Sequence, residues 1–205
     1  MDRILITGAL GQLGIEFIDH FKKLNSFVLA TDIKNPKEKL SCEFELANVL
    51  DKDKMDSLVK KYNINVIYHL VAILSANGEK DPFISWKLNM NSFQNIAQIS
   101  IENKIKKIFW PSSIAVFGTE SNLNFVSQNP LMNPTTIYGI TKLAGEKLME
   151  YYFNKFGLDI RSLRYPGIIS TKTVPGGGTT DYVIKMLNAA KKGNDYVCFL
   201  SENTE

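Results

Sequence analysis

Residues 3–14 read RILITGALGQLG, a short apolar run followed at once by glycines at every third position, Gly8, Gly11 and Gly14. From Gln12 onward apolar residues recur at helical spacing, which predicts a strand, a glycine-rich turn and an amphipathic helix in succession. Glycines in such a turn let backbone N–H groups and a helix N-terminus approach a pyrophosphate closely. The spacing alone is a weak signal, because tight strand-to-helix turns also favour glycine for purely structural reasons.

The rest of the chain continues this alternation of apolar runs and helical segments. It predicts an α/β layered fold with a parallel sheet and helices on both faces. We expect strands at 3–7, 26–31, 42–46, 65–70, 107–112, 160–164 and 196–200. We expect helices at 12–24, 53–62, 83–103, 135–156 and 180–192.

Composition and charge exclude several classes of protein. The 205 residues carry 24 Lys and Arg against 21 Asp and Glu, a net charge of +3 that predicts neither a nucleic-acid partner nor an anionic membrane partner. The most apolar segment, Ile64–Leu74, is far shorter than the ~20 residues of a membrane span. Cys42 and Cys198 lie in predicted strands without Cys or His at ligand spacing, so we expect core thiols, no metal site and a reducing, cytoplasmic location.

An acidic residue follows the second predicted strand directly. Asp32 lies 18 residues after Gly14, close to the ~20-residue offset at which a carboxylate binds the ribose diol of a dinucleotide. A carboxylate at this position repels a 2′-phosphate, so the spacing favours NAD over NADP. A solvated turn aspartate is the alternative interpretation.

Tyr138 and Lys142 lie one helical turn apart near the start of the helix predicted at 135–156, so they share a face. Lowering the pKa of a tyrosine by ~3 units requires ~4 kcal/mol, and a cation at ~4 Å in an effective dielectric of ~20 supplies about that much. The pair is therefore a candidate base, although ordinary exposed pairs share this spacing. Ser113, at the end of a predicted strand, is expected at the same edge of the sheet, where it would hold a substrate oxygen or simply cap a turn.

Together these motifs resemble the extended short-chain dehydrogenase/reductase superfamily, which includes nucleotide-sugar epimerases and dehydratases. Within it, residues 69–76, 109–118 and 161–170 and the run PGGGTTDY at 175–182 are similar to the NAD-dependent L-threonine 3-dehydrogenases. The resemblance covers the whole chain. It implies a Rossmann-type doubly wound fold, NAD as cofactor, and oxidation of L-threonine at its 3-hydroxyl to 2-amino-3-oxobutyrate.

The resemblance also implies roles for individual residues. The catalytic residues would be Tyr138, Lys142 and Ser113. Cofactor binding is implied for Gly8, Gly11, Gln12, Leu13, Gly14, Asp32, Asn48, Leu70, Ala72, Tyr138, Lys142, Tyr165, Pro166 and Ile168. The amino-acid site would be lined by Ser75, Ser113, Tyr138, Gly177 and Thr179.

The sequence departs from this family in two respects. Asn48 replaces the usual aspartate near the third strand, although its carbonyl can still accept a hydrogen bond from the adenine amino group. The chain also ends directly after the strand predicted at 196–200. We therefore expect residues 1–205 to be an NAD-binding domain with part of the substrate loops, near 165–182, and a C-terminal segment to be missing.

Other functions remain open. A nucleotide-sugar epimerase or dehydratase uses the same cofactor and catalytic residues, and a catalytically silent NAD-binding module would act through a partner. Helices of this superfamily pair across a two-fold axis, so the apolar stripes of residues 86–101 and 137–153 predict a homodimer formed through a four-helix bundle.

Overall fold

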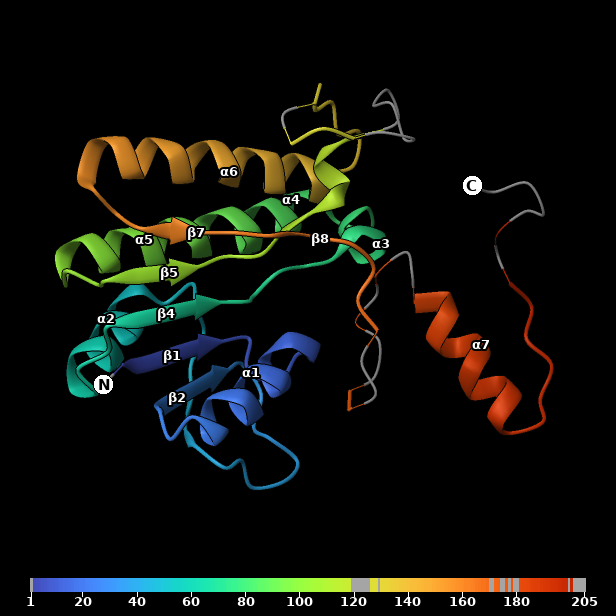
Figure 1. Cartoon of the computed structure of the whole chain (residues 1–205), viewed down its shortest axis with the longest axis horizontal. Coiled ribbons are helices and arrows are strands. Elements are labelled where there is room, and N and C mark those ends of the chain that lie inside the picture. Colours follow the sequence, from blue (N-terminus) through green and yellow to red (C-terminus); the bar gives the residue numbers. More distant parts are fainter. Residues whose placement is uncertain are drawn as a thin grey trace.

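The computed structural model describes residues 2–118, 126–128, 130–169, 172–173, 176, 178, 181–198 and 200. Its centre is a parallel six-stranded sheet with strand order β3-β2-β1-β4-β5-β7 (Figure 1). These strands are β1 (Arg3–Thr7), β2 (Phe27–Asp32), β3 (Glu43–Leu46), β4 (Val66–His69), β5 (Lys107–Phe109) and β7 (Ile160–Arg161). Two short parallel strands, β6 (Ser112–Ser113) and β8 (Arg164–Tyr165), continue the chain beyond β5 and β7.

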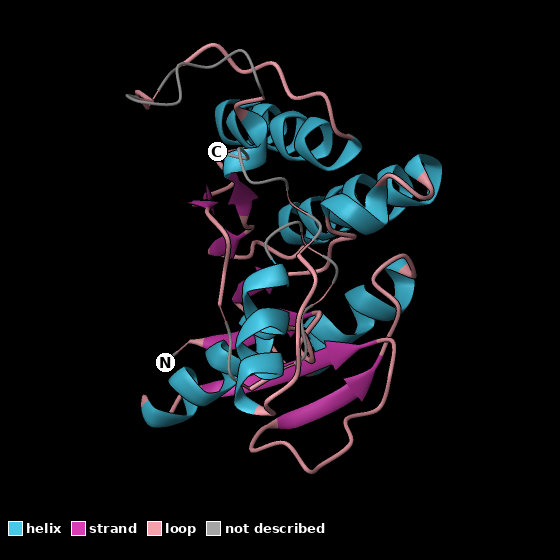
Figure 2. Cartoon of the chain, turned by 90° about the vertical axis from the view of Figure 1, so that its right-hand side faces the viewer, coloured by secondary structure: helices cyan, strands magenta, loops and turns pink. Residues whose placement is uncertain are grey.

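Helices connect the strands and cover both faces of the sheet (Figure 1, Figure 2). They are α1 (Gln12–Lys23), α2 (Lys52–Lys61), α3 (Ser75–Gly78), α4 (Pro82–Trp86), α5 (Ser92–Glu102) and α6 (Ile137–Phe156). A further helix, α7 (Asp181–Lys191), stands apart from the sheet and buries none of its residues (Figure 1). A π-helical turn, η1 (Lys87–Asn91), joins α4 to α5, and a 3-10 turn, η2 (Ile114–Val116), follows β6. The order of strands and helices is that of a doubly wound Rossmann-type fold, as the sequence predicts.

Alternate side chains of the strands enter separate cores on the two faces. On one face Ile4 and Ile6 pack with Ile18 and Phe21 of α1. On the other face Leu5 packs in a larger core formed mainly by α2, α5 and the neighbouring part of α6. Because both faces are covered, the strands are almost continuously apolar.

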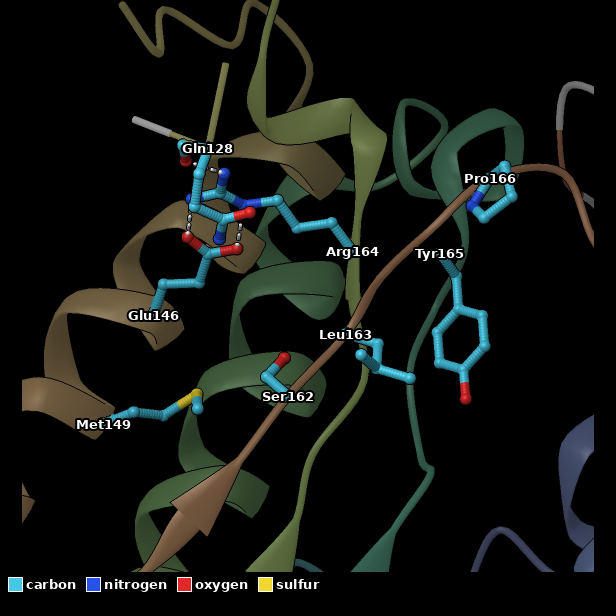
Figure 3. A pocket seen from close by; sticks show the side chains of 8 residues that line it. All are labelled: Gln128, Glu146, Met149, Ser162, Leu163, Arg164, Tyr165 and Pro166. Atoms are coloured by element: carbon cyan, nitrogen blue, oxygen red, sulfur yellow. Dashed lines mark hydrogen bonds and ion pairs between the residues drawn. The ribbon is translucent and has the colours of Figure 1, made fainter. Parts of the chain in front are cut away.

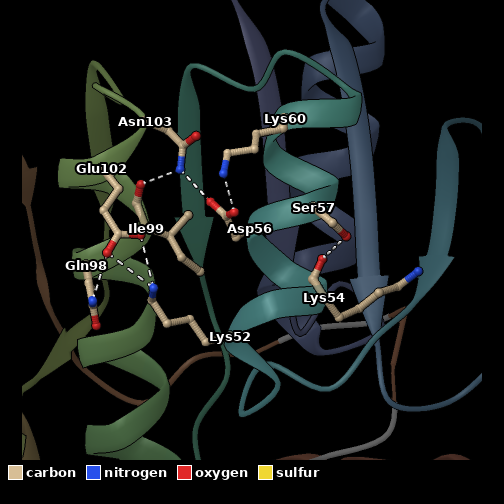
Figure 4. A network of polar contacts seen from close by, with 9 residues as sticks. All are labelled: Lys52, Lys54, Asp56, Ser57, Lys60, Gln98, Ile99, Glu102 and Asn103. Carbon is tan, nitrogen blue, oxygen red and sulfur yellow. Dashed lines mark hydrogen bonds and ion pairs between the residues drawn. The ribbon is translucent and has the colours of Figure 1, made fainter.

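A network of polar contacts joins the solvent-facing sides of α2 and α5 (Figure 4). Lys52 donates to the carboxylate of Glu102 at 3.0 Å, and the amide of Asn103 donates to Asp56 at 2.7 Å. Lys60 binds the same Asp56 carboxylate at 2.6 Å. Exposed ion pairs of this kind contribute little to stability, because water and salt screen them, so the buried core beneath them carries most of the packing energy.

The predicted elements and the observed ones agree for the first four strands, with small shifts at their ends. The strand predicted at 107–112 divides into β5 and β6, and the strand predicted at 160–164 divides into β7 and β8. Pro111 lies at the first break and has no N–H to donate to a sheet. The helix predicted at 83–103 is one helical segment with a π-helical turn in its middle.

The helix predicted at 180–192 is confirmed by α7, but the strand predicted at 196–200 was wrong. The described residues of 196–200 form no strand, and Val197 is 91% exposed. Cys198 is exposed rather than a core thiol, whereas Cys42 is half-buried beside β3, where burial raises its thiol pKa to about 11. A β-branched, aromatic run forms a strand only where a sheet edge pairs with it.

Among the described residues, no helix combines the length and apolar composition needed to cross a membrane. The same part of the chain holds no cluster of His, Cys, Asp and Glu side chains that could bind a metal ion.

Candidate functional site

The glycine turn lies between β1 and α1, at the carboxyl edge of the sheet. Gly8 has a φ of 67°, a left-handed conformation, and a Cβ there would lie 3.1 Å from the backbone nitrogen of Val71. A Cβ on Gly14 would lie 2.6 Å from the Cα of Ala9, so glycine allows α1 to pack directly on the turn. Gly11 precedes α1, and no side chain of the described residues caps its N-terminus. Gln12 and Leu13 are the first two residues of this helix. The N–H groups of its first turn have no acceptor within the helix, so they can bind an anion.

Asp32 lies beside this turn, as its spacing predicts. Its carboxylate accepts a hydrogen bond from the N–H of Leu10 at 3.1 Å, so it also holds the turn in place. Asn48, after β3, is exposed, and its side-chain oxygen accepts a bond from the N–H of Leu50 at 3.0 Å.

The loop after β4 forms the other wall of the turn. The N–H of Leu70 donates to the carbonyl of Thr7 at 3.1 Å, and Leu70 and Ala72 are both half-buried. Together the loop, the glycine turn and the Asp32 carboxylate fit a dinucleotide, because they combine a cradle without side chains, free helix N–H groups and an acceptor for a ribose diol.

The three predicted catalytic residues meet where α6 packs on β6. Tyr138 lies beside Ser113, close enough for the serine hydroxyl to act on its pKa. The same hydroxyl accepts a hydrogen bond from the N–H of Ala115 at 3.2 Å and so caps η2. Lys142 is 3% exposed, and its amine donates to the carbonyl of Pro111 at 2.6 Å.

The pKa of Tyr138 shifts in the direction opposite to the one expected from the neighbouring Lys142. Burial raises the pKa of Tyr138, and the hydrogen bond from Ser113 opposes that rise only in part. Burial also lowers the pKa of the Lys142 amine to about 7. Its Nζ lies 5.5 Å from the centre of the Tyr138 ring and 4.2 Å from that of Trp110. Desolvation of both groups therefore outweighs their mutual effect, a balance that helical spacing does not reveal.

Asn89, which the sequence analysis missed, links the loop after β4 to α6. Its side-chain oxygen accepts from the N–H of Ile73 at 2.8 Å, and its amide donates to the carbonyl of Ile73 at 3.2 Å. The same amide donates to the hydroxyl of Thr141 at 3.2 Å. Asn89 is buried in η1, and the only sequence signal for it is a polar residue inside an apolar helix.

Glu146 and Arg164 are also absent from the predicted set (Figure 3). The guanidinium of Arg164 binds the Glu146 carboxylate twice, at 2.9 and 2.8 Å, and Ser112 donates to the same carboxylate at 2.6 Å. Glu146 follows Lys142 by one helical turn, so its spacing was a usable signal.

The segment predicted to face the nicotinamide begins in β8. Tyr165 pairs in register with Ser113, while Pro166 is exposed and Ile168 is half-buried. Tyr165 and Pro166 border an open cavity of about 660 Å³ between α6 and β8 (Figure 3). Its lining consists of Gln128, Glu146, Met149, Ser162, Leu163, Arg164, Tyr165 and Pro166.

The predicted amino-acid site is described only in part. Ser75 opens α3 and is half-buried. The amide of Asn77, also in α3, donates to the carbonyl of Gly176 at 3.3 Å, so the glycine run approaches this helix. Gly177 and Thr179 lie outside the described residues.

The doubly wound sheet, the glycine turn with Asp32, and the half-buried Tyr138 beside the buried Lys142 are typical of the NAD-binding domains of the extended short-chain dehydrogenase/reductase class. Residues 4–204 match the NAD dependent epimerase/dehydratase family, and the chain belongs to that family. An epimerase/dehydratase of Staphylococcus saprophyticus that is named as uncharacterized is 42% identical over 209 residues. The match covers 100% of this chain and 65% of that protein. The chain thus spans 65% of the length of this curated relative.

The chain is equally similar to solved structures of proteins that are named as L-threonine dehydrogenases. The L-threonine dehydrogenase of Clostridium difficile superposes with a TM-score of 0.92 at 42% identity, covering 98% of this chain and 65% of that one. A monomeric L-threonine 3-dehydrogenase from a metagenome superposes with a TM-score of 0.93 at 41% identity, with the same coverage.

Proposed function

We propose that the protein is an L-threonine 3-dehydrogenase that oxidises the 3-hydroxyl of L-threonine with NAD and gives 2-amino-3-oxobutyrate, a step of threonine catabolism. The observation that carries the proposal is that Tyr138 and Ser113 lie side by side where α6 packs on β6, with the buried Lys142 one turn along the same helix. The similarity to L-threonine dehydrogenases at 42% identity over 98% of the chain supports the substrate.

Different groups of the proposed cofactor residues would bind different parts of NAD. The glycine turn with Gln12 and Leu13 would bind the pyrophosphate, and Asp32 the adenosine ribose. Asn48, Leu70 and Ala72 would surround the adenine side. Tyr165, Pro166 and Ile168 would lie against the nicotinamide. When bound, NAD supplies the acceptor for the hydride that leaves the β-carbon of threonine.

The chain's own residues would manage the proton and the oxygen. The phenolate of Tyr138 would take the proton of the threonine hydroxyl as the C–O bond becomes a carbonyl. Ser113 would donate a hydrogen bond to that oxygen, and protonated Lys142 would stabilise the negative charge beside it. Ser75, Gly177 and Thr179 would bind the amino-acid part of the substrate.

The proposal extends to the organisation of the whole protein. Residues 1–205 would form the NAD-binding domain with part of the substrate loops, and a C-terminal segment would complete the amino-acid site. We further propose a cytoplasmic homodimer that pairs through helices α4, α5 and α6. The exposed aromatic side chains of α4 and α6 support the dimer.

The test is NADH formation by the whole protein with NAD and L-threonine, read from the ultraviolet absorbance of NADH. We expect Tyr138→Phe to lower turnover by about 10²–10⁴-fold, the usual contribution of a positioned base, while NAD binding persists. Tyr151→Phe is the matched control, because Tyr151 lies on the same helix but is exposed. A wild-type protein without threonine-dependent NADH formation would refute the proposal.

A nucleotide-sugar epimerase or dehydratase is the second candidate. The name of the Staphylococcus saprophyticus relative favours it, since that protein is named as an uncharacterized epimerase/dehydratase. This candidate predicts tight binding of a uridine or thymidine diphosphate sugar. Calorimetric titration with both ligands tests it, and the absence of binding heat removes it.

A further inference from the structure

One face of α6 contacts the strand that carries Ser113 at three successive turns. Tyr138 lies beside Ser113, and Lys142 donates to the carbonyl of Pro111 at 2.6 Å. Glu146, one turn further, accepts a bond from the hydroxyl of Ser112 at 2.6 Å. The segment that carries Ser113 is thus held against α6 at the two residues directly before it, Pro111 and Ser112.

Arg164 completes this arrangement from the neighbouring strand. It lies opposite Ser112 in the register of β6 and β8, and it binds both oxygens of the Glu146 carboxylate (Figure 3). The side chains of Arg164 and Glu146 are only 18% and 16% exposed. Arg164 also donates to the carbonyl of Gln128 at 2.8 Å, which ties a third segment of the chain to the same point.

The pair is ionised although it is largely buried. Burial raises the pKa of Glu146, but the hydrogen bonds from Arg164 and Ser112 outweigh this and lower it below the usual range of a glutamate. Removing either partner would leave a charge with poor solvation, so β6, β8 and α6 would have to move to solvate it.

We propose that Glu146 and Arg164 are positioning residues of the active site: they hold β6 and β8 against α6 so that Ser113 stays beside Tyr138. This inference rests on the proposed function. Neither residue contacts the candidate base, and both act through Ser112 and the strand pairing.

The kinetic test compares Arg164→Gln and Glu146→Gln with Arg161→Gln in the whole protein. Arg161 is a matched control, because it binds Asp159 through two hydrogen bonds of 3.0 Å but contacts neither α6 nor β6 through a side-chain hydrogen bond given for the described residues. We expect kcat with threonine to fall about 10- to 100-fold in the two test variants, the cost of a small misplacement of reacting groups. NAD affinity and the control should stay within about twofold of wild type. Arg164→Lys should keep a higher kcat than Arg164→Gln, because lysine retains the positive charge but lacks the planar guanidinium that forms two hydrogen bonds.

Hydrogen exchange measured by mass spectrometry supplies a readout without turnover. Peptides covering residues 107–118 should exchange faster in Arg164→Gln and Glu146→Gln, and peptides covering β1 and α1 should not change. Unchanged exchange at 107–118, or an equal loss of kcat in Arg161→Gln, would overturn the inference. If the wild-type protein does not oxidise threonine, the proposed function fails, and the exchange comparison alone decides the positioning role.

Discussion

The amine of Lys142 is an ionisable group inside a core. It is 3% exposed, and its Nζ contacts the carbonyl of Pro111 and the ring of Trp110. Because burial lowers its pKa to about 7, about half of the amines are neutral near neutral pH. Burial of the protonated Lys142 amine therefore lowers the free energy of unfolding, although the proposed reaction uses this charged form.

This balance predicts how stability depends on pH. An unfolded lysine has a pKa near ~10.4, so between pH values of about 7 and about 10 the unfolded chain binds one proton more than the fold. The free energy of unfolding should therefore rise with pH across this window. Lys142→Met removes the titrating amine, so the free energy of unfolding of this variant should not show the same rise. The difference in free energy of unfolding between Lys142→Met and wild type should therefore shift in favour of wild type by roughly 4 kcal/mol between pH values of about 7 and about 10.

Urea unfolding at several pH values measures this difference. Lys147→Met is the control, because Lys147 is exposed on the same helix. If the wild-type and Lys142→Met curves run parallel across the window, the amine is not depressed in the fold.

Asp32 combines a structural and a selective role. Its carboxylate accepts the N–H of Leu10, so truncation would disturb the turn as well as remove the charge. Asp32→Asn keeps an acceptor oxygen and removes only the charge. We expect the preference for NAD over NADP to fall by at least about tenfold, equivalent to ~1.4 kcal/mol of lost repulsion. Binding titrations with NAD and NADP measure the ratio of the two affinities. An unchanged ratio would mean that residues other than Asp32 determine the preference for NAD.

At the scale of elements, α6 packs on the sheet through a glycine. A Cβ on Gly145 would lie 2.7 Å from Cζ3 of Trp110, whose ring is 1% exposed. The Trp110 ring also contacts the Lys142 amine. The small residue thus sets the distance between the helix and the strand that carries the site.

We expect Gly145→Ala to destabilise the protein by about 1–3 kcal/mol, because overpacking against a rigid buried ring outweighs the better helix propensity of alanine. The denaturation midpoint in urea measures the effect. Glu150→Ala, a change at an exposed position of the same helix, should leave the midpoint nearly unchanged. A Gly145→Ala protein more stable than wild type would mean that the Trp110 ring moves far enough to accommodate the added methyl group.

The same elements show what the sequence could and could not predict. The glycine turn, Asp32 and the Tyr138–Lys142 pair depend on spacing within one or two elements, and the structure places them as expected. Glu146 and Arg164 meet across 18 residues of sequence, and no local pattern pairs them. The pKa changes also depend on burial, which follows from tertiary packing alone.

At the scale of the whole molecule, the apolar stripes predicted to form a dimer interface are mostly used within the chain. Phe93, Ile96 and Ile99 of α5 are fully buried in the larger core. The exposed apolar side chains lie instead near the ends of α4 and α6, where Phe83 is 88% and Phe153 is 60% exposed. A dimer would therefore pair through fewer residues than the sequence suggests.

We expect the protein to be dimeric in light scattering at micromolar concentration, and Phe83→Glu to give a monomer that still binds NAD, because a buried charge opposes association. Lys80→Glu, a nearby exposed charge change, should keep the dimer. A wild-type monomer, as in the metagenome relative, would contradict this prediction.

The strand order β3-β2-β1-β4-β5-β7 has a consequence for synthesis. β1 is made first and ends at the centre, with β2 and then β3 added on one side and β4, β5 and β7 on the other. Domains generally begin to fold from the N-terminus as the ribosome releases the chain. Every strand of this sheet therefore joins a free edge in the order of its translation, and none has to insert between two strands that are already paired.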